Sequence, residues 1–133
     1  MNKKTNEREN GPETTNAPYG WLVTVKATGE AGRVPFNPEK CHEQLQSAVA
    51  GDIELVDLYF NLKRVDCFCN DEGKINGLPV NKVISILYGR DLICGDVVIC
   101  KHDDMGDTQG LTEEESSGVL ATLEAAGSVI AAE

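Results

Sequence analysis

Short runs in which apolar and polar residues alternate recur along the chain, and this period of two predicts β-strands. The predicted strands cover residues 21–26, 33–36, 52–60, 65–69 and 93–102. The run at 93–102 is the longest apolar stretch, which favours a central place in the sheet. Pro35 has no amide hydrogen to donate, so its strand is expected at an edge. Within 52–60 the apolar positions change parity between Leu55 and Val56, which predicts either a bulge or burial on both faces.

Helices are predicted where apolar residues return every three or four positions behind a capping residue. One follows Asn37, whose side chain can accept hydrogen bonds from the first helical amides. A second, shorter helix covers residues 81–87. A third opens at Thr112, which can form a capping box with Glu115, and it is expected to end at Gly127.

Together these elements predict an α+β fold with a mixed or mainly antiparallel sheet of about five strands, covered by two or three helices. Residues 1–19 are polar and contain almost no apolar side chains, so they are predicted to form a flexible, disordered N-terminal tail. The single domain is expected at residues 20–126, followed by a C-terminal tail at 127–133.

Charge is unevenly distributed over the 133 residues, whose formal net charge is −10. Residues 103–133 contain eight acidic residues and no Lys or Arg. Such a surface repels phosphates, so direct binding to nucleic acid is not expected. No apolar run is long enough for a membrane helix, and no apolar segment follows the N-terminal lysines as in a secretory signal. With an odd number of cysteines, five, reduced thiols and a cytoplasmic location are expected.

Cysteine and histidine residues form one weak candidate for a metal site. Cys67 and Cys69 share a face of one predicted strand, and Cys100 and His102 share a face of another. Four such ligands suit zinc if the strands bring them together. However, each pair is separated by one residue rather than the usual two to four, and free cysteines often pack as small apolar residues. Core packing is therefore the preferred interpretation, and no metal is expected.

Signatures of catalysis are absent from the sequence. Cys41 and His42 are neighbours, but adjacent residues on a helix do not face each other. A pairing of Cys94 or Cys100 with either histidine lacks a recognisable orienting acid or oxyanion hole. No Gly-rich phosphate loop occurs, so neither an enzyme activity nor a cofactor is predicted.

A second candidate is a small-ligand or nucleotide site beside the Gly-containing turn that follows residues 65–69. Polar side chains gather there along the sequence. The candidate ligand-binding residues are Asp71, Lys74, Asn76 and Asn81.

Four motifs carry a resemblance to a known family. They are Gly-Asp-Ile-Glu at 51–54, the block Asn-Asp-Glu-Gly-Lys through Leu-Pro-Val-Asn at 70–81, Asp-Leu-Ile-Cys-Gly at 91–95 and Leu-Thr-Glu-Glu at 111–114. Over residues 20–117 the chain resembles a small uncharacterised domain family encoded largely by phages, plasmids and conjugative elements of Gram-positive bacteria. The resemblance carries no known activity, and it implies an accessory role in a mobile genetic element.

The leading hypothesis is therefore a non-enzymatic binding or accessory protein of a mobile element. Its acidic C-terminal end is expected to attract a protein partner, because an acidic patch speeds the encounter with a basic surface. The candidate partner-binding residues are Asp103, Asp104, Asp107, Glu113, Glu114 and Glu115. A small-ligand domain and a cysteine–histidine metal-binding protein remain as alternatives.

Overall fold

The computed structural model describes residues 17–60 and 63–132 of the chain. Its elements are, in order, β1 (Trp21–Val25), β2 (Ala31–Pro35), the 3₁₀ helix η1 (Pro38–Lys40), α1 (Cys41–Val49), β3 (Ile53–Phe60), β4 (Lys63–Asn70), α2 (Lys82–Tyr88), β5 (Val97–His102), β6 (Thr108–Gln109) and α3 (Glu113–Ala132). Most of the predicted flexible tail, residues 1–16, lies outside the described residues. At 17–19 the chain instead makes a turn, in which the Gly20 amide donates to the Ala17 carbonyl over 3.0 Å.

The six strands form one antiparallel sheet in the order β2-β1-β5-β4-β3, and the short β6 pairs with the end of β5. β5 lies in the centre, as its apolar run predicts, and β2 with Pro35 lies at an edge. With three α-helices against this sheet, the predicted α+β class and mainly antiparallel topology are confirmed.

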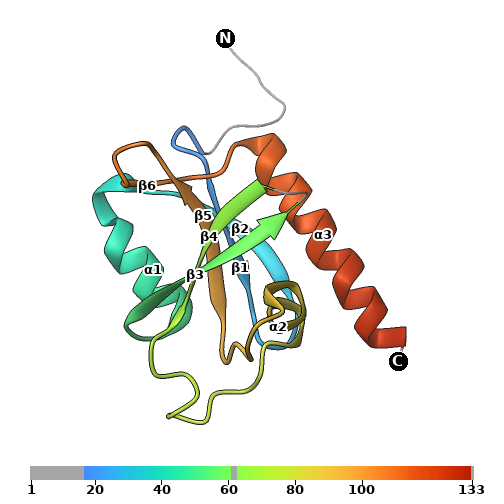
Figure 1. Cartoon of the computed structure of the whole chain (residues 1–133). Helices are drawn as coiled ribbons and strands as arrows, with labels where there is room; N and C mark the ends of the chain where they lie inside the picture. Colours follow the sequence, from blue (N-terminus) through green and yellow to red (C-terminus); the bar gives the residue numbers. More distant parts are fainter. Residues whose placement is uncertain (1–16, 61–62, 133) are drawn as a thin grey trace.

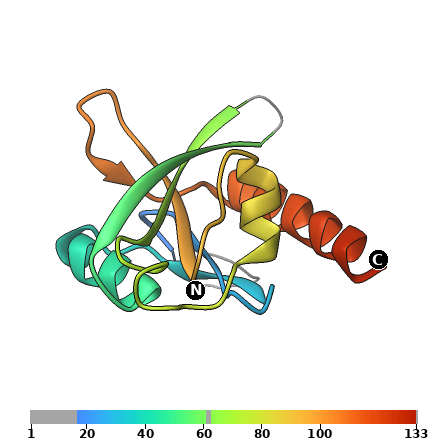
Figure 2. The ribbon, with the colours of Figure 1, turned by 60° about the horizontal axis from the view of Figure 1, so that its bottom comes forward.

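Helices cover both faces of the sheet, α1 on one and α2 with α3 on the other (Figures 1 and 2). Because side chains alternate along a strand, β5 contributes to both layers. Val98 and Cys100 pack with Leu45 of α1 in one apolar cluster. Val97 and Ile99 belong to the larger cluster that lies beneath α2 and α3. We call these two sides of the sheet the α1 face and the α2/α3 face.

Three helices begin at side-chain caps, whereas α1 follows η1 directly and its N-cap residue, Lys40, makes no side-chain cap hydrogen bond. The Asn37 side chain accepts a hydrogen bond from the amide two residues on (3.1 Å), and Asn81 caps α2 through the Ile84 amide (3.2 Å). At the start of α3, Thr112 and Glu115 exchange side-chain to amide hydrogen bonds of 2.8 and 3.0 Å, which confirms the capping box.

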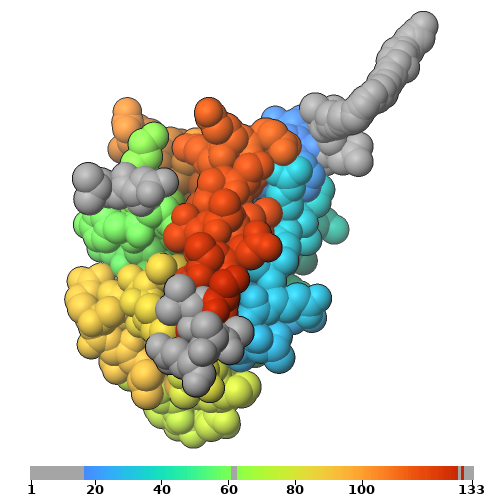
Figure 3. Space-filling view, turned by 90° about the vertical axis from the view of Figure 1, so that its right-hand side faces the viewer, coloured from blue at the N-terminus to red at the C-terminus, as the bar shows by residue number. Residues whose placement is uncertain are grey.

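α3 is longer than predicted. The helix continues through Gly127 to Ala132, so the prediction that it ends at Gly127 is wrong. The predicted C-terminal tail at 127–133 is helical as far as residue 132. Glycine inside a helix costs about 1 kcal/mol relative to alanine. Ala126 and Ile130 pack against the α2/α3 cluster on either side of it and offset that cost. Figure 3 shows α3 along this side of the molecule, between β2 and α2.

β3 contributes to both faces of the sheet without a bulge. Its pairing with β4 is continuous from Ile53 opposite Asn70 to Phe60 opposite Lys63, so β4 begins earlier than predicted. Ile53 packs with the α1 cluster, whereas Leu58 and Phe60 belong to the α2/α3 cluster. None of the helices in residues 17–60 and 63–132 combines the length and apolar character that a membrane crossing requires.

Candidate interaction surface

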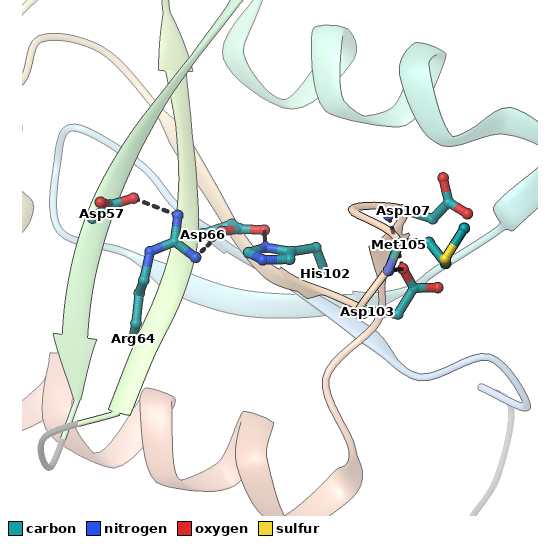
Figure 4. A network of polar contacts seen from close by, with 7 residues as sticks. All are labelled: Asp57, Arg64, Asp66, His102, Asp103, Met105 and Asp107. Atoms are coloured by element: carbon teal, nitrogen blue, oxygen red, sulfur yellow. Dashed lines mark hydrogen bonds and ion pairs between the residues drawn. The ribbon is translucent and has the colours of Figure 1, made fainter.

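The loop between β5 and β6, residues 103–107, is acidic and is organised by one of its own carboxylates. Asp103 Oδ1 accepts hydrogen bonds from the amides of Met105 and Asp107, each at 2.9 Å, and Oδ2 accepts from Gln109 Nε2 at 3.3 Å. Asp103 is therefore a structural residue of the loop. Asp104, Met105 and Asp107 are exposed, and the exposed fraction of Met105 is 86%. We call residues 103–107 the acidic loop (Figure 4).

A chain of ionic contacts runs across the α1 face next to this loop (Figure 4). His102 Nδ1 lies 2.8 Å from Asp66 Oδ2, and Arg64 Nη1 lies 3.1 Å from Asp66 Oδ1. Arg64 Nη2 also donates to Asp57 Oδ1 over 2.5 Å. Asp66 pairs across the strands with Cys100, whose side chain belongs to the α1 cluster, so the four residues share that face. We call Asp57, Arg64, Asp66 and His102 the polar network.

Asp66 is the buried centre of the polar network, with 2% of its surface exposed. The Arg64 guanidinium lies close enough to Asp66 Oδ1 for an ion pair, but its N–H is not aimed at that oxygen. Among the described residues, Oδ1 is a buried side-chain acceptor without a hydrogen bond. Burying a carboxylate oxygen without a hydrogen bond lowers the stability of the fold. Packing of the apolar core therefore does not explain why an aspartate occupies position 66.

The other members of the polar network are half exposed, and Arg64 and Asp57 shift each other's pKa. The hydrogen bond from Arg64 holds the pKa of Asp57 below its ordinary value, and the same contact raises the pKa of Arg64. Because His102 Nδ1 is held by Asp66, the ring nitrogen left for an outside group is Nε2. Sequence reasoning missed this network, although an aspartate within the apolar run 65–69 is a signal that could have revealed it.

The first turn of α3 carries the remaining predicted partner-binding acids, and two of them are already paired. Glu113 contacts Arg33 at 2.9 Å, and Glu115 contacts Lys101 at 2.8 Å. Burial raises the pKa of Glu115, but the hydrogen bonds from Lys101 and Thr112 outweigh it and leave the pKa below its ordinary value.

The structure divides the six predicted acids into two groups rather than one surface. The acidic loop lies on the α1 side of the sheet, and α3 begins on the other side (Figures 1 and 2). In the part of the chain that the structure describes, Asp104, Asp107 and Glu114 make no ion pair. The acidic loop, with two such carboxylates beside an exposed methionine, is the better candidate for a contact surface.

The predicted ligand-binding residues are only partly brought together. Asp71 and Lys74 line a cavity of about 270 Å³, but Lys74 Nζ is paired with Asp91 at 2.6 Å, which raises the pKa of the lysine and lowers that of the acid. Asn76 is exposed and does not line this cavity.

Asn81 has a structural role instead of the predicted ligand contact. It is fully buried, and its amide donates to the carbonyls of Val25 and Gly95 at 3.2 and 3.1 Å. Its oxygen caps α2. All its polar atoms are thus engaged within the fold, and the prediction that Asn81 binds a ligand is wrong.

The four candidate metal ligands cannot meet, because they lie on opposite faces of the sheet. Cys67 pairs with Ile99 rather than Cys100, and this one-residue offset places Cys67 and Cys69 in the α2/α3 cluster. Cys100 and His102 point to the α1 face. No group of three or more metal-binding side chains occurs among the described residues.

The buried thiols behave as apolar side chains. Burial raises the pKa of Cys67 and Cys100 and raises that of Cys69 to about 11. All three are protonated at neutral pH, which suits packing rather than metal binding or nucleophilic attack.

Comparison with known protein families gives a match. A family model described as "Domain of unknown function (DUF3846)" matches residues 22–124, from β1 to the middle of α3. No curated protein and no solved structure matches the chain.

Proposed function

The chain belongs to the DUF3846 family of domains of unknown function, and we propose that it is a non-enzymatic binding protein that holds a protein partner on its acidic loop. The observation that carries this proposal is the exposed Met105, held at the tip of a loop between two carboxylates that have no ion pair with any described residue. Met105 is not part of the core, so a partner can bury its side chain without disturbing the packing of the domain. Methionine is also enriched at protein interfaces.

Rigidity of the acidic loop supports this role. The hydrogen bonds of Asp103 hold the amides of Met105 and Asp107, and the Asp103 amide donates to the Asp107 carbonyl over 2.9 Å. A loop that is already ordered loses less conformational entropy when it binds, so more of the contact energy appears as affinity.

Charge identifies the kind of partner that suits this loop. Asp104 and Asp107 flank the exposed methionine, and the chain as a whole carries a net charge of −10. A partner with Lys and Arg side chains around a small apolar depression would complement both features. The neighbouring His102 offers one further polar contact through its Nε2. The resemblance to proteins of mobile elements adds the proposal that the partner belongs to the cell that hosts such an element.

The proposal is tested by affinity capture from a lysate of cells that carry the gene, followed by mass spectrometry. The wild-type protein is compared with a loop variant, Asp104→Lys/Asp107→Lys, and with a control that reverses two exposed acids elsewhere, Glu30→Lys/Glu124→Lys. We expect a stoichiometric partner that the control retains and the loop variant loses.

Equal capture by both variants would contradict a role for the acidic loop, and equal loss would point to net charge alone. In a second step, Met105→Ala should weaken the captured complex without changing the charge. A hot-spot side chain costs more than about 1 kcal/mol on truncation, which corresponds to at least a fivefold weaker complex.

A further inference from the structure

The outer edge of β3 leaves a row of backbone groups without a strand partner. The Asp71 amide donates to the Asp52 carbonyl over 2.9 Å, so even-numbered residues of this segment bond toward β4. Odd-numbered residues must turn their amides and carbonyls outward, since the two sets alternate in an antiparallel pair. The outward-facing residues are Ile53, Leu55, Asp57 and Tyr59. Only the Asp57 carbonyl meets a described side chain, accepting from Arg90 Nη2 at 3.2 Å.

The opposite edge of the sheet, β2, is protected by comparison. It has five residues where β3 has eight, and Pro35 has no amide hydrogen. The Pro35 carbonyl already accepts from Gln44 Nε2 at 3.0 Å. β3 has neither a proline nor a lysine, and its pairing with β4 has no bulge. Of the usual devices against strand pairing, β3 has only the charges of Glu54 and Asp57 and the contact of Arg90 with the Asp57 carbonyl.

Apolar side chains next to the β3 edge are also uncovered. Leu55 is 46% exposed and Tyr59 is 57% exposed. Both side chains point to the α1 face, where α1 does not cover them. Strand pairing along this edge would cover them with the residues opposite. An exposed edge with apolar neighbours is the arrangement that accepts a further strand.

One antiparallel register satisfies every outward-facing group of two copies of this strand. If the two-fold axis passes between the two Val56 residues, Ile53 of each copy lies opposite Tyr59 of the other. Leu55 then lies opposite Asp57. All four outward-facing residues thereby form hydrogen-bonded pairs, and the apolar Ile53 and Tyr59 side chains meet on the same face.

Charges at this edge complement each other in the same register. Arg90 follows α2, stacks on Tyr88 and reaches the β3 edge at Asp57. Glu54 points to the same α2/α3 face, and the register places it opposite Leu58 of the other copy, beside that Arg90. Within the described residues neither Glu54 nor Arg90 has an ion-pair partner, so each copy would supply the charge that the other lacks.

We propose that the β3 edge binds a second copy of this chain, forming a two-fold dimer with one sheet continuous through both copies. The acidic loop of each copy lies on the α1 side and takes no part in the pairing of the two β3 strands. The dimer therefore does not depend on the proposed function. A dimer would present two acidic loops to a partner, which strengthens binding to any target with repeated sites.

Sedimentation equilibrium of the full chain from micromolar to millimolar concentration tests the dimer. We expect the wild-type mass to rise to that of two chains, and Leu55→Lys to keep the mass of one. Val34→Lys, which adds the same charge at an exposed position of β2, should still dimerise. A single-chain mass for the wild type at every concentration, or equal loss in both variants, would overturn the proposal.

A charge exchange tests the second copy and its register directly. Arg90→Glu and Glu54→Arg should each raise the dimer dissociation constant roughly tenfold, because two symmetry-related surface ion pairs become repulsive. The double variant Arg90→Glu/Glu54→Arg should restore it. Both positions are exposed, and an unchanged thermal unfolding midpoint at a concentration where every variant is monomeric will show that the variants fold. A double variant no tighter than the singles would rule out the proposed register.

Discussion

The two faces of the sheet show the same alternation of side chains but are used differently. On the α2/α3 face, the buried residues of the central strands are apolar, and two helices cover them. On the α1 face, one nine-residue helix covers a smaller apolar cluster, and the strands then continue into the polar network and the acidic loop. One face thus serves as the core of the domain, while the other combines a smaller core with an exposed polar surface.

Asp66 makes the difference between the faces concrete. Its neighbours in β4, Val65 and Cys67, point to the α2/α3 face and are buried among apolar side chains. Asp66 is equally buried but depends on Arg64 and His102 for its charge. Replacing a buried ionic group by a well-packed apolar residue is often neutral or stabilising. The stability of the fold therefore does not explain an acid at position 66. The contact that holds the His102 ring in place at the surface does explain it.

The largest expected effect comes from matched leucine truncations on the two faces. Leu123 of α3 and Leu45 of α1 are 3% and 2% exposed, so folding removes a similar area of each side chain from water. Leu123→Ala should cost about 3–5 kcal/mol and Leu45→Ala about 2–3 kcal/mol, because a small cluster can close around a cavity more easily. Urea unfolding of both variants measures this, and a greater loss for Leu45→Ala would reverse the proposed ranking of the faces.

A smaller effect is expected at the polar network. Asp66→Asn should cost about 1–2 kcal/mol, since it removes a charge from Arg64 and His102, whose partial exposure to water softens the loss. Asp66→Leu should unfold at a urea concentration equal to or above that of Asp66→Asn, because an apolar side chain suits the buried site. A far less stable leucine variant would show that the acid supports the fold itself.

Cysteine reactivity sharpens the contrast between buried and accessible positions. Cys41 and Cys94 are half-buried, while Cys67, Cys69 and Cys100 are buried with raised pKa values. With iodoacetamide at about pH 8, the first two should react and the other three should be labelled only on unfolding. Peptide mass spectrometry reads the result. Labelling of Cys67 or Cys100 in the folded protein would mean that the sheet opens more readily than its packing implies.

The smallest effect concerns acid titration of the polar network. Because Arg64 lowers the pKa of Asp57 in the folded chain, the stability from this pair is fully present above the unfolded pKa. It is lost as the pH falls through the folded value, below about pH 4. Asp57→Asn should therefore lower stability slightly at neutral pH and less in strong acid. An identical pH profile for both proteins would exclude the pair as a contributor.

The fold was accessible from the sequence because its signals are local. Alternation located the strands, and Asn37, Asn81 and Thr112 marked the starts of η1, α2 and α3. The start of α1 at Cys41 has no side-chain cap. The end of α3 was not accessible, because the packing of Ile130 overrides the local preference of Gly127.

The candidate surface could be predicted only in part, since it depends on strand register. A shift of one residue decides whether Cys67 lies beside Cys100 or on the other face, and no local pattern fixes that shift. The same register brings Asp66 to His102, 36 positions along the chain. Composition located the acids of the loop, but it could not show that two of the six are already paired with Arg33 and Lys101.

Photo-crosslinking at the tip of the acidic loop tests the central claim most directly. A photo-reactive amino acid replaces Met105 in one protein and Ile75 in another, since Ile75 is almost as exposed, at 83% against 86%, and also lies in a loop with acidic neighbours. In cells that carry the gene, we predict one dominant crosslinked protein from position 105 that is absent from position 75. The same products from both positions, or none from position 105, would contradict binding through the acidic loop.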